Sequence, residues 1–196
     1  MNINKPYFYK KLRESRLFNN LSQEQVEGIE GIFEAWEKYG DGFLNTLAYA
    51  FATAYHETGA NMVPVREGFA KSDVVARMRT KNRAYGKPDG VYGHVYYGRG
   101  IVQLTWLENY KRTGQILGLD LVKDPDLAMK PEVSARILIE GLIDGRWNAK
   151  GHGIQFYLRN NDLKNARRTV NVLDKWEQIK GYYETFLKIL EKSIEE

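Results

Sequence analysis

Apolar residues recur at helical spacing between residues 43 and 57. They fall on one side of a helix, at Leu44, Leu47, Ala48, Phe51 and Tyr55. Gly59 follows closely and is a typical residue at which a helix ends. The pattern therefore predicts a helix that turns one face towards a hydrophobic core.

Four other stretches show the same periodicity and predict helices over residues 5–17, 22–40, 131–143 and 176–194. The second of these begins with Ser22 and Gln25, which are spaced to form a capping box. Residues 87–96 differ, because proline, aspartate and glycine precede alternating apolar residues. That pattern predicts a turn and a short strand, arranged as a hairpin beside a cleft.

The length of 196 residues favours a single domain. We divide it into an N-terminal helical support (1–42), a catalytic core (43–187) and the end of a C-terminal helix (188–196). The N-terminus lacks the apolar segment of a signal peptide, and the chain has no run of 18 apolar residues. We therefore expect a monomer without stable membrane insertion, which stays cytoplasmic until a holin-type route releases it to the cell wall.

The chain has no cysteine, which excludes disulfides and thiolate chemistry, and its formal net charge is +4. Basic residues are densest in residues 76–88, at Arg77, Arg79, Lys81, Arg83 and Lys87. Such a segment is typical of a solvated loop, of a nucleic-acid contact, or of a surface attracted to anionic cell wall or membrane. Because it joins the two candidate motifs described next, we favour attraction of substrate near a cleft and expect no nucleic-acid partner.

Glu57 is the first candidate for chemistry. It lies in the last turn of the helix predicted over residues 43–57, beside the small side chains of Ala50, Thr53 and Ala54. The negative end of the helix dipole and a partly dry site would both favour the protonated form, which a general acid needs. The alternative is a solvated glutamate at a helix end.

Glu67 is the second candidate, ten residues further on in a loop that contains Pro64 and Gly68. The adjacent Arg66 should favour its ionised form, unless the two residues form only a local ion pair. One carboxyl kept neutral and one kept charged are the requirement for hydrolysis of a glycosidic bond. The pair therefore indicates a glycosidase.

A run rich in glycine, aromatic and amide residues extends from Tyr96 to Tyr110. Gly98 and Gly100 would allow the backbone to approach a sugar ring closely. Tyr96, Tyr97 and Trp106 could stack on sugars, with burial in the core as the alternative.

These segments resemble glycoside hydrolase family 19, which comprises chitinases and related peptidoglycan-cleaving endolysins. The resemblance rests on His56-Glu57-Thr58, Pro64-Val65-Arg66-Glu67, the stretch from Tyr97 to Thr105, and Asn109-Tyr110. It continues through Leu117–Leu121, Asp124–Ala128 and Arg167–Asn171, and so covers roughly residues 44 to 187.

The resemblance implies a mainly α-helical, lysozyme-like fold with two lobes, a central cleft and at most a small β-hairpin. It also implies inversion at the anomeric carbon, with Glu57 as the general acid. The substrate-binding residues that the resemblance implies are Gln103, Thr105, Asn109 and Asn171. We add Tyr97 and Arg99, which lie in the same motif.

The sequence departs from the plant chitinases where they place the second acid, because Arg77 to Thr80 contains no carboxylate. The phage-type branch has an acidic residue nine or ten positions after the first, which Glu67 matches, and Asp73 is the reserve candidate. Members of the family often have a glycine and a Glu/Arg arrangement after the asparagine that corresponds to Asn171, and these residues support the general acid. Here Val172, Asp174 and Lys180 match that arrangement only imperfectly.

The three histidines stand far apart and His56 lacks the second histidine of a zinc-binding helix, so we predict no metal and no cofactor. Our first interpretation is a hydrolase of the β-1,4 bonds in peptidoglycan. Its alternative is a chitinase, since both polymers contain N-acetylglucosamine. An alternative of another class is a non-catalytic protein that binds cell-wall carbohydrate.

Overall fold

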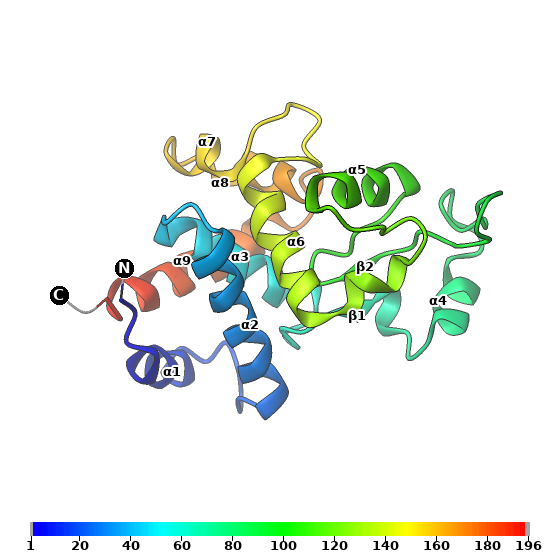
Figure 1. Ribbon diagram of the computed structural model, residues 1–196. Coiled ribbons are helices and arrows are strands. Elements are labelled where there is room, and N and C mark those ends of the chain that lie inside the picture. Colours follow the sequence, from blue (N-terminus) through cyan, green and yellow to red (C-terminus); the bar gives the residue numbers. More distant parts are fainter. Residues whose placement is uncertain (1, 195–196) are drawn as a thin grey trace.

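One helix, α3 (Leu44–Glu57), runs through the middle of the protein (Figure 1). The computed structural model describes residues 2–194, and in it every residue of α3 from Thr46 to Ala54 is buried. The helix α9 (Trp176–Glu191) packs along α3, and α2 (Gln23–Tyr39) and α6 (Pro131–Asp144) also contact it. The helix predicted over residues 43–57 is therefore confirmed as the centre of the core.

The N-terminal helices cover one side of this core. In α1 (Lys5–Glu14), Phe8 and Leu12 point inward and are fully buried. In α2, the amide of Gln25 donates to the hydroxyl of Ser22, and the amide of Ser22 donates to the side chain of Gln25. This confirms the predicted capping box.

The C-terminal part completes the larger lobe. The helix α6 ends at Gly145, whose positive φ of 64° suits a glycine at a helix end. Two short helices follow, α7 (Ile154–Leu158) and α8 (Leu163–Ala166), and then a 3₁₀ turn, η3 (Arg167–Thr169). Within residues 2–194, no helix has both the length and the apolar character that crossing a bilayer requires.

The middle of the chain forms a smaller lobe, at the opposite end from the chain termini in Figure 1. It contains a two-stranded antiparallel sheet of β1 (Val65–Arg66) and β2 (Arg99–Gly100). A small cluster of buried side chains holds it together, formed by Ala70, Ala76, Val95 and Tyr97. Its other elements are η1 (Glu67–Phe69) and α4 (Asp73–Thr80). The helix α5 (Leu107–Leu117) and η2 (Pro125–Met129) lie between it and the larger lobe, because their buried residues Tyr110, Leu117 and Ala128 pack in the main core.

Residues 87–96 do not form the predicted strand or hairpin. The carboxylate of Asp89 accepts hydrogen bonds from the backbone amides of Val91, Tyr92 and His94. These bonds use the amides that a strand would need for pairing, so the segment folds as a turn. The sheet forms instead between two segments that lie more than thirty residues apart, as the pairing of Val65 with Gly100 shows.

Candidate active site

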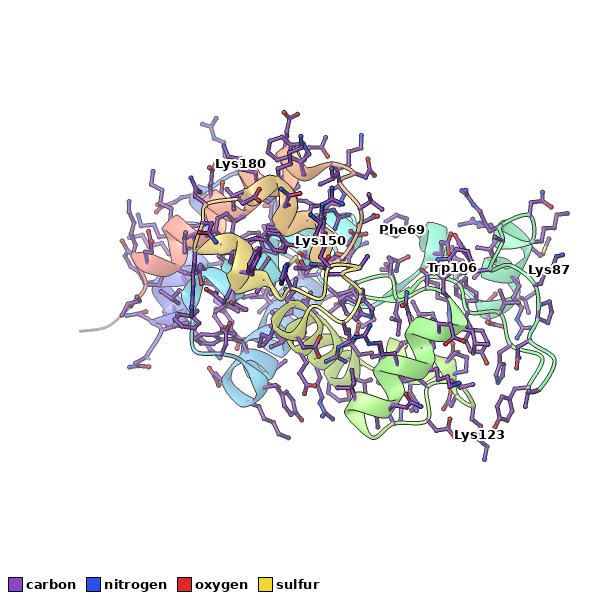
Figure 2. All side chains as sticks on the ribbon, turned by 90° about the horizontal axis from the view of Figure 1, so that it is seen from above. Phe69, Lys87, Trp106, Lys123, Lys150 and Lys180 are labelled. Atoms are coloured by element: carbon purple, nitrogen blue, oxygen red, sulfur yellow. The ribbon has the colours of Figure 1, made fainter. Side chains whose placement is uncertain are left out.

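A cavity of about 720 Å³ lies between the two lobes. Glu57 and Glu67 both line it, from the larger and the smaller lobe respectively. In Figure 2, Lys150 marks the larger-lobe side, and Trp106 marks the smaller-lobe side. The other lining residues are Tyr85, Gly98, Val102, Gln103, Leu104, Thr105, Asn109, Trp147, Asn148, Ala149, Arg168, Val170, Asn171 and Val172. A cavity of this size is typical of ligand sites.

Glu57 is the last residue of α3, and its side chain is 15% exposed. Its Oε1 accepts a hydrogen bond of 2.6 Å from Nη2 of Arg167, a guanidinium that is only 1% exposed. Nε of Arg167 donates in turn to the backbone oxygen of Asp174, which orients the guanidinium. The carboxyl is therefore held at one oxygen by a buried cation, while its edge faces the cavity.

Burial shifts the pKa of two neighbouring groups on α3, and the charges of Glu57 and Arg167 modify the shifts. Burial raises the pKa of Tyr49, which Arg167 opposes and Glu57 reinforces. Burial lowers the pKa of His56 below its usual 6.5, with the nearby charge of Glu57 opposing the shift. His56 is therefore neutral at pH 7.

Glu67 has two neutral hydrogen-bond donors. The hydroxyl of Tyr85 donates to Oε1 at 2.6 Å, and the backbone amide of Gly98 donates to Oε2 at 2.9 Å. Burial, together with the hydrogen bond to Glu67, raises the pKa of Tyr85 to about 12, so that the phenol keeps its proton at neutral pH. Hydrogen bonds of this kind favour a carboxylate.

Arg66 does not pair with Glu67, so the prediction that it supports this carboxylate is wrong. Strand β1 turns the guanidinium to the other side, where it donates to both oxygens of Asp126 at 2.7 and 2.8 Å. This hydrogen-bonded pair holds the pKa of Asp126 below its usual value.

The glycine at position 98 brings the backbone close to two polar side chains, those of Gln103 and Thr105. A Cβ atom there would lie 2.8 Å from Oε1 of Gln103 and 3.3 Å from Oγ1 of Thr105, and the first of these distances would be a clash. Gln103 is itself fixed, because its Nε2 donates to the backbone oxygens of Val65 and Gly100. Asn109 donates similarly to the backbone of Thr105. The amide and hydroxyl groups on this wall are thus positioned by the backbone around the sheet.

The comparison with known proteins decides the family. The family model of glycoside hydrolase family 19, described as "Chitinase class I", matches residues 33–139. The chain belongs to glycoside hydrolase family 19.

Relatives of this family 19 chain include an endochitinase of Arabidopsis thaliana (At2g43610), 38% identical over 93 residues, 45% of this chain and 28% of that protein. An endochitinase of Solanum tuberosum is 27% identical over 173 residues, 74% of this chain and 52% of that protein. Inactive chitinase-like protein 1 of Hevea brasiliensis is 37% identical over 89 residues, 36% of this chain and 28% of that protein. The chain thus spans about a quarter to a half of the length of these relatives.

The solved structure of chitinase C from Streptomyces griseus HUT6037 superposes with a TM-score of 0.62 at 21% identity. The match covers 96% of this chain and 76% of that one. This agreement confirms the predicted fold, mainly helical with a small sheet, as that of family 19.

Two residues that we predicted to bind substrate do not reach the cavity of this family 19 chain. Tyr97 is fully buried, and Arg99 is 1% exposed with its guanidinium 3.6 Å from the centre of the Tyr97 ring. Arg99 donates to Asp73 and Asp126 at 2.9 and 2.8 Å, and so joins α4 and η2 to the sheet. The prediction of substrate contacts for both residues is wrong, because they form the interior of the smaller lobe.

Asp73, the reserve candidate for the second carboxylate, belongs to the same interior network. Its Oδ1 accepts from Tyr97 and Arg99, and its Oδ2 pairs with Arg77 at 2.6 Å. Asp73 does not line the cavity, whereas Glu67 does. The geometry therefore favours Glu67 over Asp73.

The remaining predicted site residues, Gln103, Thr105, Asn109 and Asn171, all line the cavity. Trp106 lines it as well and is 49% exposed, which favours a surface position over the core. Its backbone φ of 76° is strained for a residue other than glycine, and such strain clusters at functional sites. Its ring contacts that of Tyr85 edge to face, with the ring centres 5.1 Å apart.

Sequence reasoning missed the two residues that hold the carboxyls. Arg167 lies within a segment that resembles the family, but the support for Glu57 was expected after Asn171. Tyr85 lies within the segment that was considered only for its cations. The residues around Arg167 and Tyr85 in the sequence form no pattern from which their partners Glu57 and Glu67 could be predicted.

Proposed function

We propose that this chain hydrolyses the β-1,4 bonds between N-acetylglucosamine units of chitin or a chitin-like polysaccharide. One observation carries the proposal: Glu57 and Glu67 come from different lobes and line one cavity together. An inverting glycosidase needs two carboxyl groups on opposite faces of the sugar, with room for water beside one of them.

Glu57 acts as the general acid in this proposal. Arg167 occupies Oε1, whereas no hydrogen bond to Oε2 is found within residues 2–194, so Oε2 is the oxygen that presents the proton to the leaving group. As the proton leaves, negative charge develops on the carboxylate. The guanidinium 2.6 Å away stabilises this charge more in the transition state than in the ground state.

Glu67 acts as the general base. Tyr85 and Gly98 each donate one hydrogen bond, so each carboxylate oxygen keeps acceptor capacity for a water molecule. The hydroxyl of Thr105 lies beside Gly98 and donates to the backbone oxygen of Gln103, and in this proposal its oxygen accepts a hydrogen bond from that water. The side chains proposed to bind the sugar are the amides of Gln103 and Asn109, which can form hydrogen bonds, and Trp106, whose exposed ring can stack on a sugar.

Glu57→Gln tests the proposal, because it keeps the shape of the side chain and removes its proton. We expect it to abolish the release of reducing ends from N-acetylglucosamine oligomers. The unfolding midpoint should fall, because the buried guanidinium of Arg167 loses its counter-ion, so the assay is run well below the midpoint of the variant. Glu108→Gln, at an exposed position on α5, makes the same charge change outside the cavity and should leave the rate unchanged.

The fresh reducing ends should have the α configuration in NMR spectra, as inversion of a β bond requires. Near-native activity of Glu57→Gln would contradict the assignment of the acid. Binding of oligomers by the native protein without any release of reducing ends would favour a non-catalytic binding protein, and one relative is itself named as an inactive chitinase-like protein.

Peptidoglycan is the second candidate substrate, and one observation favours it. Lys150 and Arg168 line the cavity on the larger-lobe side, and within residues 2–194 neither has an acidic partner at salt-bridge distance. Two cations of this kind would complement the carboxylates of the peptides that peptidoglycan carries on its lactyl groups, which chitin lacks. The named relatives are chitinases or chitinase-like proteins, and so support chitin as the first candidate.

Parallel assays on chitin oligomers and purified peptidoglycan distinguish the two substrates. If peptidoglycan is cleaved, the double variant Lys150→Met/Arg168→Gln should raise KM for peptidoglycan more than for chitin oligomers. Cleavage of chitin oligomers alone by the native protein would remove peptidoglycan from consideration.

A further inference from the structure

The outer face of the smaller lobe concentrates the positive charge of the protein. Residues 68–95 contain six lysines and arginines against two aspartates, which gives this segment a net charge of +4. That equals the formal net charge of the whole chain, so the rest of the sequence is neutral overall. The excess of positive over negative residues in the chain therefore comes from this segment.

Five of these cations are exposed and have no acidic partner at salt-bridge distance within residues 2–194. Arg79 donates to the backbone oxygen of Gly68, and the other four are Lys71, Lys81, Arg83 and Lys87. The two aspartates of the segment are engaged elsewhere, since Asp73 binds Arg99 in the interior and Asp89 accepts three backbone amides in its own turn. The cations thus remain free to attract an anionic partner.

Exposed apolar side chains lie among these cations. Val74 and Met78 are 66% and 67% exposed, four residues apart on the outer face of α4, whereas Ala76 points inward. The neighbouring turn adds Val91 and Tyr92, which are 79% and 46% exposed. Arg77 ties this turn to α4, because its Nη1 donates to the backbone oxygen of Gly93 at 3.1 Å.

Cations on the protein would be enough to bind a nucleic acid or a phosphate polymer. Binding to either would not require exposed aliphatic side chains on the protein. The interface of a bilayer accepts both kinds of side chain, since cations contact the lipid phosphates while apolar groups enter between the headgroups. We propose that the outer face of α4 and the turn at residues 89–93 adsorb to the surface of an anionic phospholipid bilayer.

The position of this face is compatible with enzyme activity. Of residues 71–93, only Tyr85 lines the cavity, so adsorption leaves the cavity open. Figure 2 shows Lys87 at the edge of the smaller lobe that lies away from Lys150 and the cavity. The cationic face has an acidic border. The backbone oxygen of Lys123 is 2.9 Å from Nε2 of His94, and the exposed residues Asp120 and Asp124 lie next to Lys123 in the chain.

Sedimentation with vesicles tests the proposal. We expect the full chain to bind vesicles of phosphatidylcholine and phosphatidylglycerol, to release them as salt is raised, and not to bind phosphatidylcholine alone. Lys81→Gln/Lys87→Gln should weaken binding about fivefold for each lysine removed. Val74→Ser/Met78→Ser should weaken it roughly tenfold with no change in charge.

The matched control is Lys111→Gln/Ile116→Ser on α5, which removes an exposed cation and an exposed apolar residue elsewhere and should bind as the native protein does. Thermal unfolding midpoints near the native value show that the variants are folded. Equal binding to uncharged vesicles would overturn the proposal. So would unchanged binding of Val74→Ser/Met78→Ser, or equally tight binding to soluble polyphosphate, since either outcome means charge attraction alone.

Discussion

Tyr85→Phe tests whether the second carboxylate must be held in place. The change removes only the hydroxyl that donates to Oε1 of Glu67 at 2.6 Å, and it keeps the ring that contacts Trp106. Glu67 retains the hydrogen bond from the backbone of Gly98, so the carboxylate stays in the cavity but can rotate.

The expected size of the effect follows from the environment of this hydrogen bond. A hydrogen bond to a charged group contributes about 1.5 to 3 kcal/mol. Tyr85 is only partly buried, so water can replace its hydroxyl, and the lower end of this range applies. About 1.5 kcal/mol corresponds to a roughly tenfold lower kcat.

The assay measures kcat and KM on soluble N-acetylglucosamine oligomers. We expect the loss in kcat with KM within about twofold, because the aromatic wall is unchanged and only the positioning of the base is affected. Tyr92→Phe is the matched control, since it removes a hydroxyl from an exposed tyrosine that does not line the cavity. A native kcat for Tyr85→Phe, together with an inactive Glu67→Gln, would refute the reasoning.

Three further predictions follow from the same structure. Arg99→Met should lower the free energy of unfolding in urea by about 3 kcal/mol, because two aspartates lose their buried counter-ion, whereas Arg112→Met at an exposed site should have little effect. The lowered pKa of His56 means that the unfolded chain takes up a proton first as pH falls below about 6.5, so the folded state loses stability on acidification. The thermal midpoint of His56→Gln should therefore fall less between about pH 7.5 and about pH 5 than that of the native protein. Gly98→Ala should reduce kcat and also lower the thermal midpoint, since its Cβ displaces the Gln103 side chain and weakens the hydrogen bonds of Gln103 to Val65 and Gly100, and a native kcat would contradict this close packing.

The sequence predicted helices well where an apolar stripe is uninterrupted. The central helix α3 and the capped helix α2 were both recognisable, because their residues favour helix and burial at the same time. The helices α4 and α5 were missed. Helix α4 is short and rich in arginine, and α5 contains Gly114 and begins at the strained Trp106, so neither has a long apolar pattern.

The candidate site shows the same division between local and distant information. The position of Glu57 at a helix end is local, and the sequence predicted it. Its partner Arg167 is 110 residues away, and the folding of α8 and η3 decides which basic residue reaches it. From the sequence, the adjacent Arg66 was expected to be the partner of Glu67. The pairing of β1 with β2 directs the Arg66 side chain towards Asp126 instead.

The two carboxyl groups differ in the kind of donor that holds them, and this difference matches their proposed roles. Glu57 is bound by a buried cation, which stabilises the negative charge that appears when an acid gives up its proton. Glu67 is bound by a phenol and a backbone amide, which orient the carboxylate without neutralising it. A base must keep its negative charge in order to attract a proton from water, so a cation at Glu67 would weaken the role that the neutral donors preserve. In the proposed roles, the cation at Glu57 stabilises the carboxylate that remains after the proton is transferred, and the neutral donors at Glu67 leave its negative charge available to the attacking water.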